Sequence, residues 1–188
     1  MDGRDVERAL TEALRVLAAR QDEDWSVRAG SLTWTCRETA VHIAHDLLAY
    51  AGQLAARPQD GYLPFDLAVR PEAPIAEVLD VVRACGGLLA AALATGRPKD
   101  RAWHWGPTDP TGFAAMGTAE ILLHTWDITR GLGGGWTPPE PLCAAVLARL
   151  FPDAPAGEPA AVLLWCTGRA ELPGRPRRTS WVWQAALG

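Results

Sequence analysis

The sequence predicts an all-α fold: a four-helix bundle with long crossover loops and a short C-terminal extension. Three observations support this prediction. Apolar residues recur every three or four positions in several long segments, capping residues and glycines mark the ends of those segments, and proline-rich stretches separate them. The chain has 188 residues, 48% of them hydrophobic, which is enough for one domain with a sizeable core. In helical bundles, metal and ligand sites are built from side chains on facing helices.

The first two helices have clear starting points. Apolar residues spaced four, four and three apart predict an amphipathic helix over residues 2–20, with Asp2 as its N-cap. These apolar residues are Val6, Leu10, Leu14 and Leu17. The second helix is expected to run from Thr35 to about Ala56. Its first turn has the spacing of a capping box, in which Thr35 and Glu38 each accept the backbone N–H of the other.

Two further long helices follow, separated by irregular segments. Residues 57–73 contain three prolines and a glycine, which predicts a crossover loop. A third helix is predicted over residues 74–95. Two adjacent glycines inside it indicate either close helix packing or a local break. After a second loop at 97–111, a fourth helix is predicted over about 112–130, ending at Gly131.

A short C-terminal extension completes the chain. We expect the bundle to occupy residues 1–137, with 138–188 forming a helical extension and tail packed on the same domain. Two prolines open a short helix that ends at about Leu150. Residues 158–167 form either another short helix or a strand, and the tail that follows is rich in proline and arginine.

Composition and charge exclude several classes of protein. The net charge is −4 and the one short basic cluster lies at residues 175–178, so we expect no nucleic-acid partner. No apolar run approaches the ~20 residues that cross a bilayer, and the charged N-terminus lacks the apolar core of a signal peptide. We therefore expect a cytoplasmic protein, either a monomer or a homodimer, with no membrane partner.

The spacing of the cysteines and the rarity of lysine give information about the chemistry and the source of the protein. The four cysteines are scattered and form no CxxC pair, which argues against a zinc ribbon or a redox motif and indicates buried free thiols. Of the 18 basic residues only Lys99 is a lysine. This bias is typical of a GC-rich coding genome.

A narrow polar stripe runs along the predicted fourth helix between apolar residues. On a helical wheel it contains Phe113, Gly117, Glu120, His124 and Asp127. A buried charge in such a stripe needs a partner, a proton or a metal. Glu120 and His124 are four residues apart, so they lie one turn apart and within reach of one metal ion. The same spacing fits an ordinary Glu–His ion pair.

An open tetrahedral metal site needs a third protein ligand, and three further histidines are candidates. The wheel of the second helix places His42 nearly opposite the core face and His45 at its border, so periodicity slightly favours His45. Glu38 lies four residues before His42 but is better explained by the capping box. His104, between two tryptophans, is a loop ligand, a pocket residue or part of a packed loop.

Three segments resemble motifs of one known family. Residues 34–43 (WTCRETAVHI) resemble its first motif, residues 120–127 (EILLHTWD) resemble its second, and residues 164–174 resemble a C-terminal stretch found in many members. The family is that of the mycothiol-dependent maleylpyruvate isomerase-like proteins, which belong to the DinB-like metal-binding four-helix bundles. The motifs occur in the expected order, and the resemblance spans nearly the whole chain.

The resemblance implies a metal site made by His42, Glu120 and His124, in place of the His45 that periodicity favours. It also implies zinc as the metal and mycothiol, a small-molecule thiol of actinobacteria, as co-substrate. The same ligands would accept Ni²⁺ or Fe²⁺, and the arginine bias fits an actinobacterial genome. The maleylpyruvate isomerase itself carries a further C-terminal domain, of which residues 138–188 can supply only a reduced version.

These features predict a metal-dependent isomerase or S-transferase that acts on a small electrophilic metabolite. A metal-bound thiolate would add to the electrophile. If it leaves again after bond rotation the outcome is isomerisation, and if it stays the outcome is S-transfer. One alternative is a hydrolase or lyase that uses metal-bound water. The other is a non-catalytic metal-binding protein of the same fold.

Several other residues receive roles in this prediction. Asp127 is expected to orient a metal ligand or to pair with an arginine, and His45 to support the site from outside the metal's coordination sphere. Arg130 is expected to hold a substrate carboxylate, or else to stabilise the end of the helix. The remaining candidates for contact with the substrate are His104, Trp103, Trp105, Trp181 and Trp183.

Overall fold

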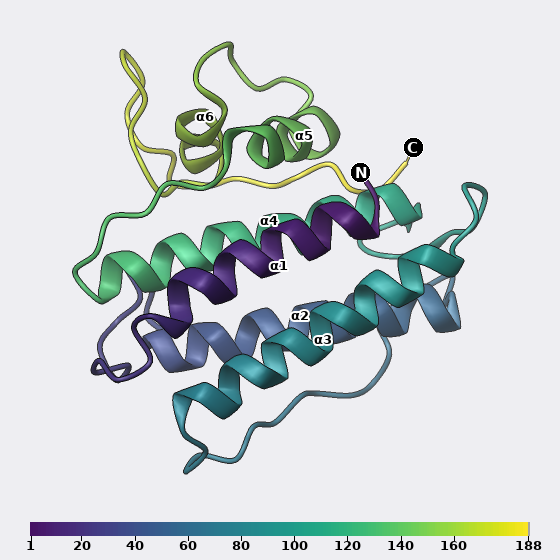
Figure 1. Cartoon of the computed structure of the whole chain (residues 1–188). Coiled ribbons are helices and arrows are strands. Elements are labelled where there is room, and N and C mark those ends of the chain that lie inside the picture. The colour runs from purple at the N-terminus through teal and green to yellow at the C-terminus, as the bar shows by residue number, and fades with distance from the viewer. Residues whose placement is uncertain (188) are drawn as a thin grey trace.

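The computed structural model describes residues 1–187 and confirms the all-α prediction (Figure 1). The long helices are α1 (Gly3–Ala18), α2 (Cys36–Ala56), α3 (Ile75–Thr95) and α4 (Pro110–Gly131). Two shorter helices follow, α5 (Glu140–Leu150) and α6 (Pro159–Cys166). A small hairpin, made of β1 (Ala102–Trp103) and β2 (Pro107–Thr108), precedes α4.

The four long helices form a closed bundle around one core. Both α1 and α2 contact both α3 and α4, so the order around the bundle is α1, α3, α2, α4. Large side chains from all four helices are fully buried at the centre: Leu17, Ile43, Leu47, Leu89, Phe113 and Leu122. Removal of such side chains from water supplies the main favourable term in folding, about 25 cal/mol per Å² of apolar surface.

Capping residues set where the helices begin. The capping box predicted for Thr35 and Glu38 is present, and Asp2 caps α1 as predicted. At α4 the Asp109 carboxylate accepts a backbone N–H of the first turn at 2.8 Å. This helix therefore begins at Pro110, two residues earlier than predicted, with proline in the first turn where its missing N–H costs nothing.

The adjacent glycines of α3 do not break the helix. A Cβ atom at Gly86 would lie 2.6 Å from Leu10 Cδ2, so this glycine lets α1 and α3 approach closely. A Cβ atom at Gly87 would have no atom within 4 Å. Of the two predicted explanations, close packing is therefore the one that applies, and it applies to Gly86.

The hairpin lies in a segment that the sequence analysis assigned to a loop. Its strands pair Ala102 with Thr108 and Trp103 with Pro107 in antiparallel register. Strands of two residues contain no alternating apolar pattern, so periodicity gives no sign of them. The turn between the strands carries His104, whose side chain is buried.

The extension packs on the bundle on the side opposite α3 (Figure 1). Here α5 contacts α4 and α6 contacts α5, so residues 158–167 are mostly helical and not a strand. Arg149 holds the tail, since it donates to the carbonyls of Gln184 (2.9 Å) and Ala185 (2.7 Å) and pairs with Asp109 (2.8 Å). The predicted domain boundary before α5 stays a prediction.

Among the described helices, α3 alone is long and apolar enough to cross a membrane, with a mean hydropathy of 1.7 in its most apolar window. No such segment was expected from the sequence. Length and composition are weak evidence, because the core helix of a soluble protein has the same properties. Packing accounts for its apolar character, since α3 contacts the other three long helices and 44% of that window is buried in the bundle.

Candidate metal centre

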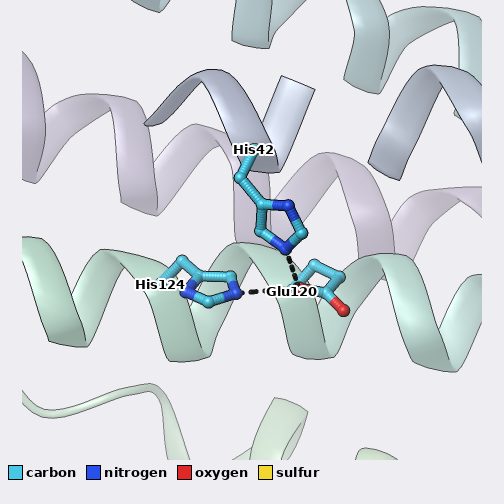
Figure 2. Close-up of side chains that lie close together, drawn as sticks. All are labelled: His42, Glu120 and His124. Carbon is cyan, nitrogen blue, oxygen red and sulfur yellow. Dashed lines mark ion pairs between the residues drawn. The ribbon is translucent and has the colours of Figure 1, made fainter. Parts of the chain in front are cut away.

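Three side chains of the types that can bind a metal ion meet between α2 and α4 (Figure 2). His42 projects from α2, and Glu120 and His124 project from α4. One ligand atom of each lies within 4.8 Å of the other two. Glu120 Oε2 lies 3.0 Å from His124 Nε2 and 3.7 Å from His42 Nε2. Both imidazoles therefore converge on the carboxylate, as Figure 2 shows.

The position of His42 explains why helical periodicity did not select it. Periodicity identifies the face of α2 that packs in the bundle core, whereas this cluster lies at the edge of that core, and the His42 side chain is 29% exposed. Trp34, in the loop before α2, lies against His42 with 4.6 Å between ring centroids. Trp34 therefore covers His42, which the helical wheel of α2 places on the surface.

Asp46 connects the two histidines of α2. Its Oδ2 lies 3.4 Å from His42 Nε2, and its Oδ1 lies 3.0 Å from His45 Nδ1. His45 therefore contacts Asp46, which in turn contacts His42, a candidate metal ligand. Burial, reinforced by the charge of Glu120, raises the pKa of Asp46 to about 7. The sequence analysis gave Asp46 no role, although its spacing of four from His42 was a usable signal.

Asp127 supports the cluster from behind His124. Its Oδ2 lies 3.0 Å from His124 Nδ1 and 2.7 Å from Arg169 Nη2. Asp127 thus pairs with an arginine, as one of its two predicted interpretations states, and it also contacts the His124 imidazole. Its predicted role in orienting a metal ligand stays a prediction. Arg169 follows α6, so the C-terminal extension reaches the site. Sequence reasoning missed this residue, although it stands in the quoted C-terminal motif.

His124 and Glu120 form a charged pair when no cation is bound. Burial lowers the pKa of His124, but its hydrogen bonds to Asp127 and Glu120 outweigh burial and raise the pKa to about 9. Burial raises the pKa of Glu120, yet the hydrogen bond from His124, together with the charges of His124, His42 and Arg169, outweighs that effect and lowers the pKa. A metal ion must therefore displace a proton from His124.

His42 is already in the protonation state that metals require. Burial lowers its pKa to about 4, even though the nearby Glu120 carboxylate acts in the opposite direction. The imidazole is consequently neutral at neutral pH, with a lone pair available for a cation. The second oxygen of Glu120, Oε1, accepts a hydrogen bond from the buried Tyr50 hydroxyl at 3.5 Å.

Of the residues predicted to contact the substrate, some line a cavity next to the cluster and others do not. Arg130 is exposed at the end of α4, with its guanidinium 5.9 Å from the ring centroid of Trp126, which agrees with the helix-end interpretation. Trp103 belongs to the hairpin, and its carbonyl accepts a hydrogen bond from Gln53 at 2.7 Å. The predicted residues that line a cavity next to the cluster are His104, Trp105, Trp181 and Trp183.

The cluster opens into a cavity of about 740 Å³ with basic walls, which we call the arginine chamber. Besides the three cluster residues, it is lined by Trp34, Arg169, Arg177, Arg178, Trp181 and Trp183, among others. This volume lies within the roughly 300–1,000 Å³ typical of small-molecule sites.

A second cavity, of about 690 Å³, adjoins the first at the cluster, and we call it the aromatic chamber. Both chambers are lined by His42, Glu120, Trp181 and Trp183. The other walls of the aromatic chamber include Asp46, Tyr50, His104, Trp105, Ala185 and Ala186. The cluster therefore stands between two cavities of different chemical character.

Comparison with protein families gives a match over most of the bundle. A family model described as the mycothiol maleylpyruvate isomerase N-terminal domain matches residues 6–129. This chain belongs to that family. The matched part of this mycothiol maleylpyruvate isomerase-family protein contains all three cluster residues, whereas Arg169 and the tail lie outside it. Comparisons with curated proteins and with solved structures gave no significant match.

The side chains of this family member fit a divalent metal ion. Two imidazoles and one carboxylate make the donor set of many catalytic zinc sites, and Ni²⁺ or Fe²⁺ accepts the same donors. The Asp127 carboxylate behind His124 is the kind of outer partner that metal-bound histidines have in such sites. Three protein donors would leave a coordination position free on a bound ion, and the two chambers would give an exogenous ligand room to reach it.

Proposed function

We propose that the protein is a metal-dependent isomerase or S-transferase that uses mycothiol and acts on a small electrophilic metabolite. The observation that carries this proposal is the His42–Glu120–His124 cluster, which lies at the edge of the bundle core in a member of the mycothiol maleylpyruvate isomerase family. The cluster opens to a cavity of small-molecule size. We further propose that it works in the cytoplasm of an actinobacterium, with zinc as the metal.

Each residue of the centre has a task in this proposal. His42, Glu120 and His124 would hold the ion, and Asp127 keeps the His124 ring turned so that Nε2 faces the site. A divalent ion bound there supplies a Lewis-acidic position at which a thiol, with an ordinary pKa of about 8.5, ionises at neutral pH. Trp34 covers His42 and restricts water on that side.

The arginine chamber favours an electrophile that carries a carboxylate. Arg169 is paired with Asp127, but Arg177 and Arg178 have no acidic partner among the described residues. Two uncompensated guanidinium groups in a cavity attract an anion, and a guanidinium can hold a carboxylate through two hydrogen bonds. These residues thus take the role that the sequence analysis gave to Arg130.

A second candidate function is hydrolysis or a lyase reaction with an activated water. Asp46 favours it, because a carboxylate 3.4 Å from His42 Nε2 is close enough to the centre to accept a proton from a water held there. This function needs no thiol, so thiol dependence separates the two candidates. A non-catalytic metal-binding role would show neither activity.

The test of the proposed function is thiol activation. We expect the zinc-loaded protein to lower the pKa of the mycothiol thiol below about 8.5 and to speed its reaction with electrophiles that carry a carboxylate. Thiolate absorbance against pH measures the first effect, and product analysis across an electrophile panel measures the second. An unchanged thiol pKa together with thiol-independent turnover would contradict the proposal.

The metal centre has its own test. We expect His124→Ala to lose about one metal ion per chain, because three protein donors are the usual minimum for a catalytic zinc site. His45→Ala is the matched control, since His45 contacts Asp46 and Asp66 and not the cluster, and it should keep the ion. Elemental analysis of the purified variants measures both, and equal metal content in them would show that the cluster is not the site.

A further inference from the structure

The aromatic chamber contains a histidine that none of the proposed chemistry uses. His42, His45 and His124 each have a carboxylate oxygen within 3.4 Å of a ring nitrogen. His104 has no such partner among the described residues. Its side chain is buried, and its Nδ1 atom has no hydrogen-bond partner there.

The hairpin holds His104 firmly in this position. Its backbone N–H donates to the Gly106 carbonyl at 2.8 Å. Its ring lies edge-on to Tyr50 and Phe113, with centroid distances of 5.6 Å and 6.4 Å. Trp183, from the tail, lies 6.4 Å away. The imidazole is therefore surrounded by aromatic rings, and its Nδ1 atom is left without a hydrogen-bond partner among the described residues.

An unpaired buried nitrogen is costly unless a ligand satisfies it. Burial lowers the pKa of His104, so the ring is neutral and offers one N–H donor and one acceptor nitrogen. A buried polar group without a partner costs about 1–3 kcal/mol. A group bound in the chamber and hydrogen-bonded to His104 would recover that cost.

The charged residues that line the aromatic chamber restrict the charge of the ligand that can bind there. No arginine or lysine is among the described residues that line it, in contrast to the arginine chamber. An anion would find no partner there. Asp46 and Glu120 also line the chamber, but a metal ion held by His42 and Glu120 would offset their attraction for a cation, and this step rests on the proposed function. The tryptophan and tyrosine faces suit a flat group that stacks on them.

We propose that the aromatic chamber is a binding site for a neutral, planar group that hydrogen-bonds to His104. The cluster then lies between two reactant sites. The arginine chamber binds the anionic reactant, and the aromatic chamber binds the neutral part of the second reactant. His104 acts as a specificity-determining residue, since it selects a ligand that can pair with a neutral imidazole.

Three planar probes of similar size test this assignment: benzamide is neutral, benzoate is an anion and benzamidine is a cation. Binding to the zinc-loaded protein is followed by the NMR signals of the tryptophan indole N–H groups. We expect benzamide to shift the signals of Trp105 and Trp183 and to bind there about tenfold more tightly than benzamidine, which corresponds to about 1.4 kcal/mol. We expect benzoate to shift the signal of Trp34, in the arginine chamber.

His104→Phe keeps an aromatic ring but removes both ring nitrogens. We expect it to weaken benzamide binding about fivefold to tenfold, the value of one net hydrogen bond. Arg177→Gln, in the arginine chamber, is the matched control and should leave benzamide binding unchanged. If His104→Phe does not fold, Ala186→Phe tests whether the chamber is the binding site, because its ring would fill the chamber from the tail without altering His104.

The proposal is overturned if benzamide leaves the Trp105 signal unmoved, if benzamidine binds more tightly, or if neither variant weakens benzamide binding. These outcomes differ from a failure of the proposed function. A protein that binds benzamide as expected but activates no thiol would refute the function and retain the chamber. A protein that activates the thiol but does not bind benzamide would support the function and refute the assignment of the chamber.

Discussion

Asp127 makes two contacts that the sequence analysis treated as alternatives. One of its oxygens contacts both His124 Nδ1 and Arg169 Nη2. The first contact fixes the imidazole so that Nε2 faces Glu120, and the second balances a carboxylate that is fully buried. His124 is three residues away, whereas Arg169 is 42 residues further along the chain. Local spacing could therefore reveal the first partner and not the second.

The Asp127 contact predicts a loss of metal affinity without loss of a ligand. Asp127→Asn keeps the size of the side chain but removes the charge that makes His124 a better donor. We expect zinc affinity to fall about 10- to 100-fold, as is usual when the outer partner of a metal-bound histidine is altered. Competition with a chelator measures it. Asp153→Asn, an exposed substitution, is the control, and equal affinities for the two variants would argue against the role.

At the scale of elements, the end of α4 positions the loop that precedes α2. A Cβ atom at Gly131 would collide with the carbonyl oxygen of Arg28 and lie 3.0 Å from Ala29 Cα, so the loop backbone packs directly on the last turn of α4. The same loop carries Trp34 onto His42. Gly131, predicted only as a helix end, is thus also a point of close approach.

Two glycine-to-alanine substitutions should have opposite effects on stability. In Gly131→Ala the new methyl group meets rigid backbone, so we expect the free energy of unfolding to fall by about 1–3 kcal/mol. Gly87→Ala is the matched control, because its methyl group has free space on the exposed face of α3. It should raise the free energy of unfolding by up to about 1 kcal/mol. Urea titrations measure both, and a Gly131→Ala as stable as the parent would contradict the packing argument.

At the scale of the whole molecule, the charged pair makes stability depend on pH. The folded state raises the pKa of His124 from 6.5 to about 9, so its proton stabilises the fold fully below pH 6.5. That stabilisation is lost as pH rises through 9, because the folded state then gives up the proton it had retained. We expect the metal-free protein to lose roughly 2 kcal/mol of unfolding free energy between pH 7 and pH 9.

Urea unfolding of the metal-free protein at several pH values measures this loss. His124→Gln is the control, since it has no titrating ring and should show a much smaller dependence on pH above 7. Bound metal also replaces the proton, so the loaded protein should not lose this stability as pH rises, and metal affinity should increase with pH. If the parent and His124→Gln lose the same unfolding free energy as pH rises, the loss does not come from His124.

The extension beyond the family match completes both chambers. The match ends at residue 129, yet Arg169, Trp181 and Trp183 line the cavities around the cluster. Arg149 fastens this segment to the start of α4, because it pairs with Asp109 and donates to two tail carbonyls. The candidate metal ligands and the residues that shape the space around them therefore come from different stretches of the chain.

The sequence by itself determined the local features. The four long helices, the Thr35 capping box and the placement of Glu120, His124 and Asp127 on one stripe all depend on residues within one or two turns of each other. Such features follow from spacing and from the hydrogen-bonding needs of helix ends. The choice of His42 came from a resemblance to other proteins, since periodicity slightly favoured His45.

Tertiary structure decided what depends on packing between distant segments. It brought α2 against α4 so that His42 faces Glu120, delivered Arg169 to Asp127, and placed His104 in a chamber closed by the tail. These contacts join residues far apart in the chain, and periodicity describes only which face of an element is apolar. The position of a polar side chain at the edge of the core is set by the neighbours that cover it, as Trp34 covers His42.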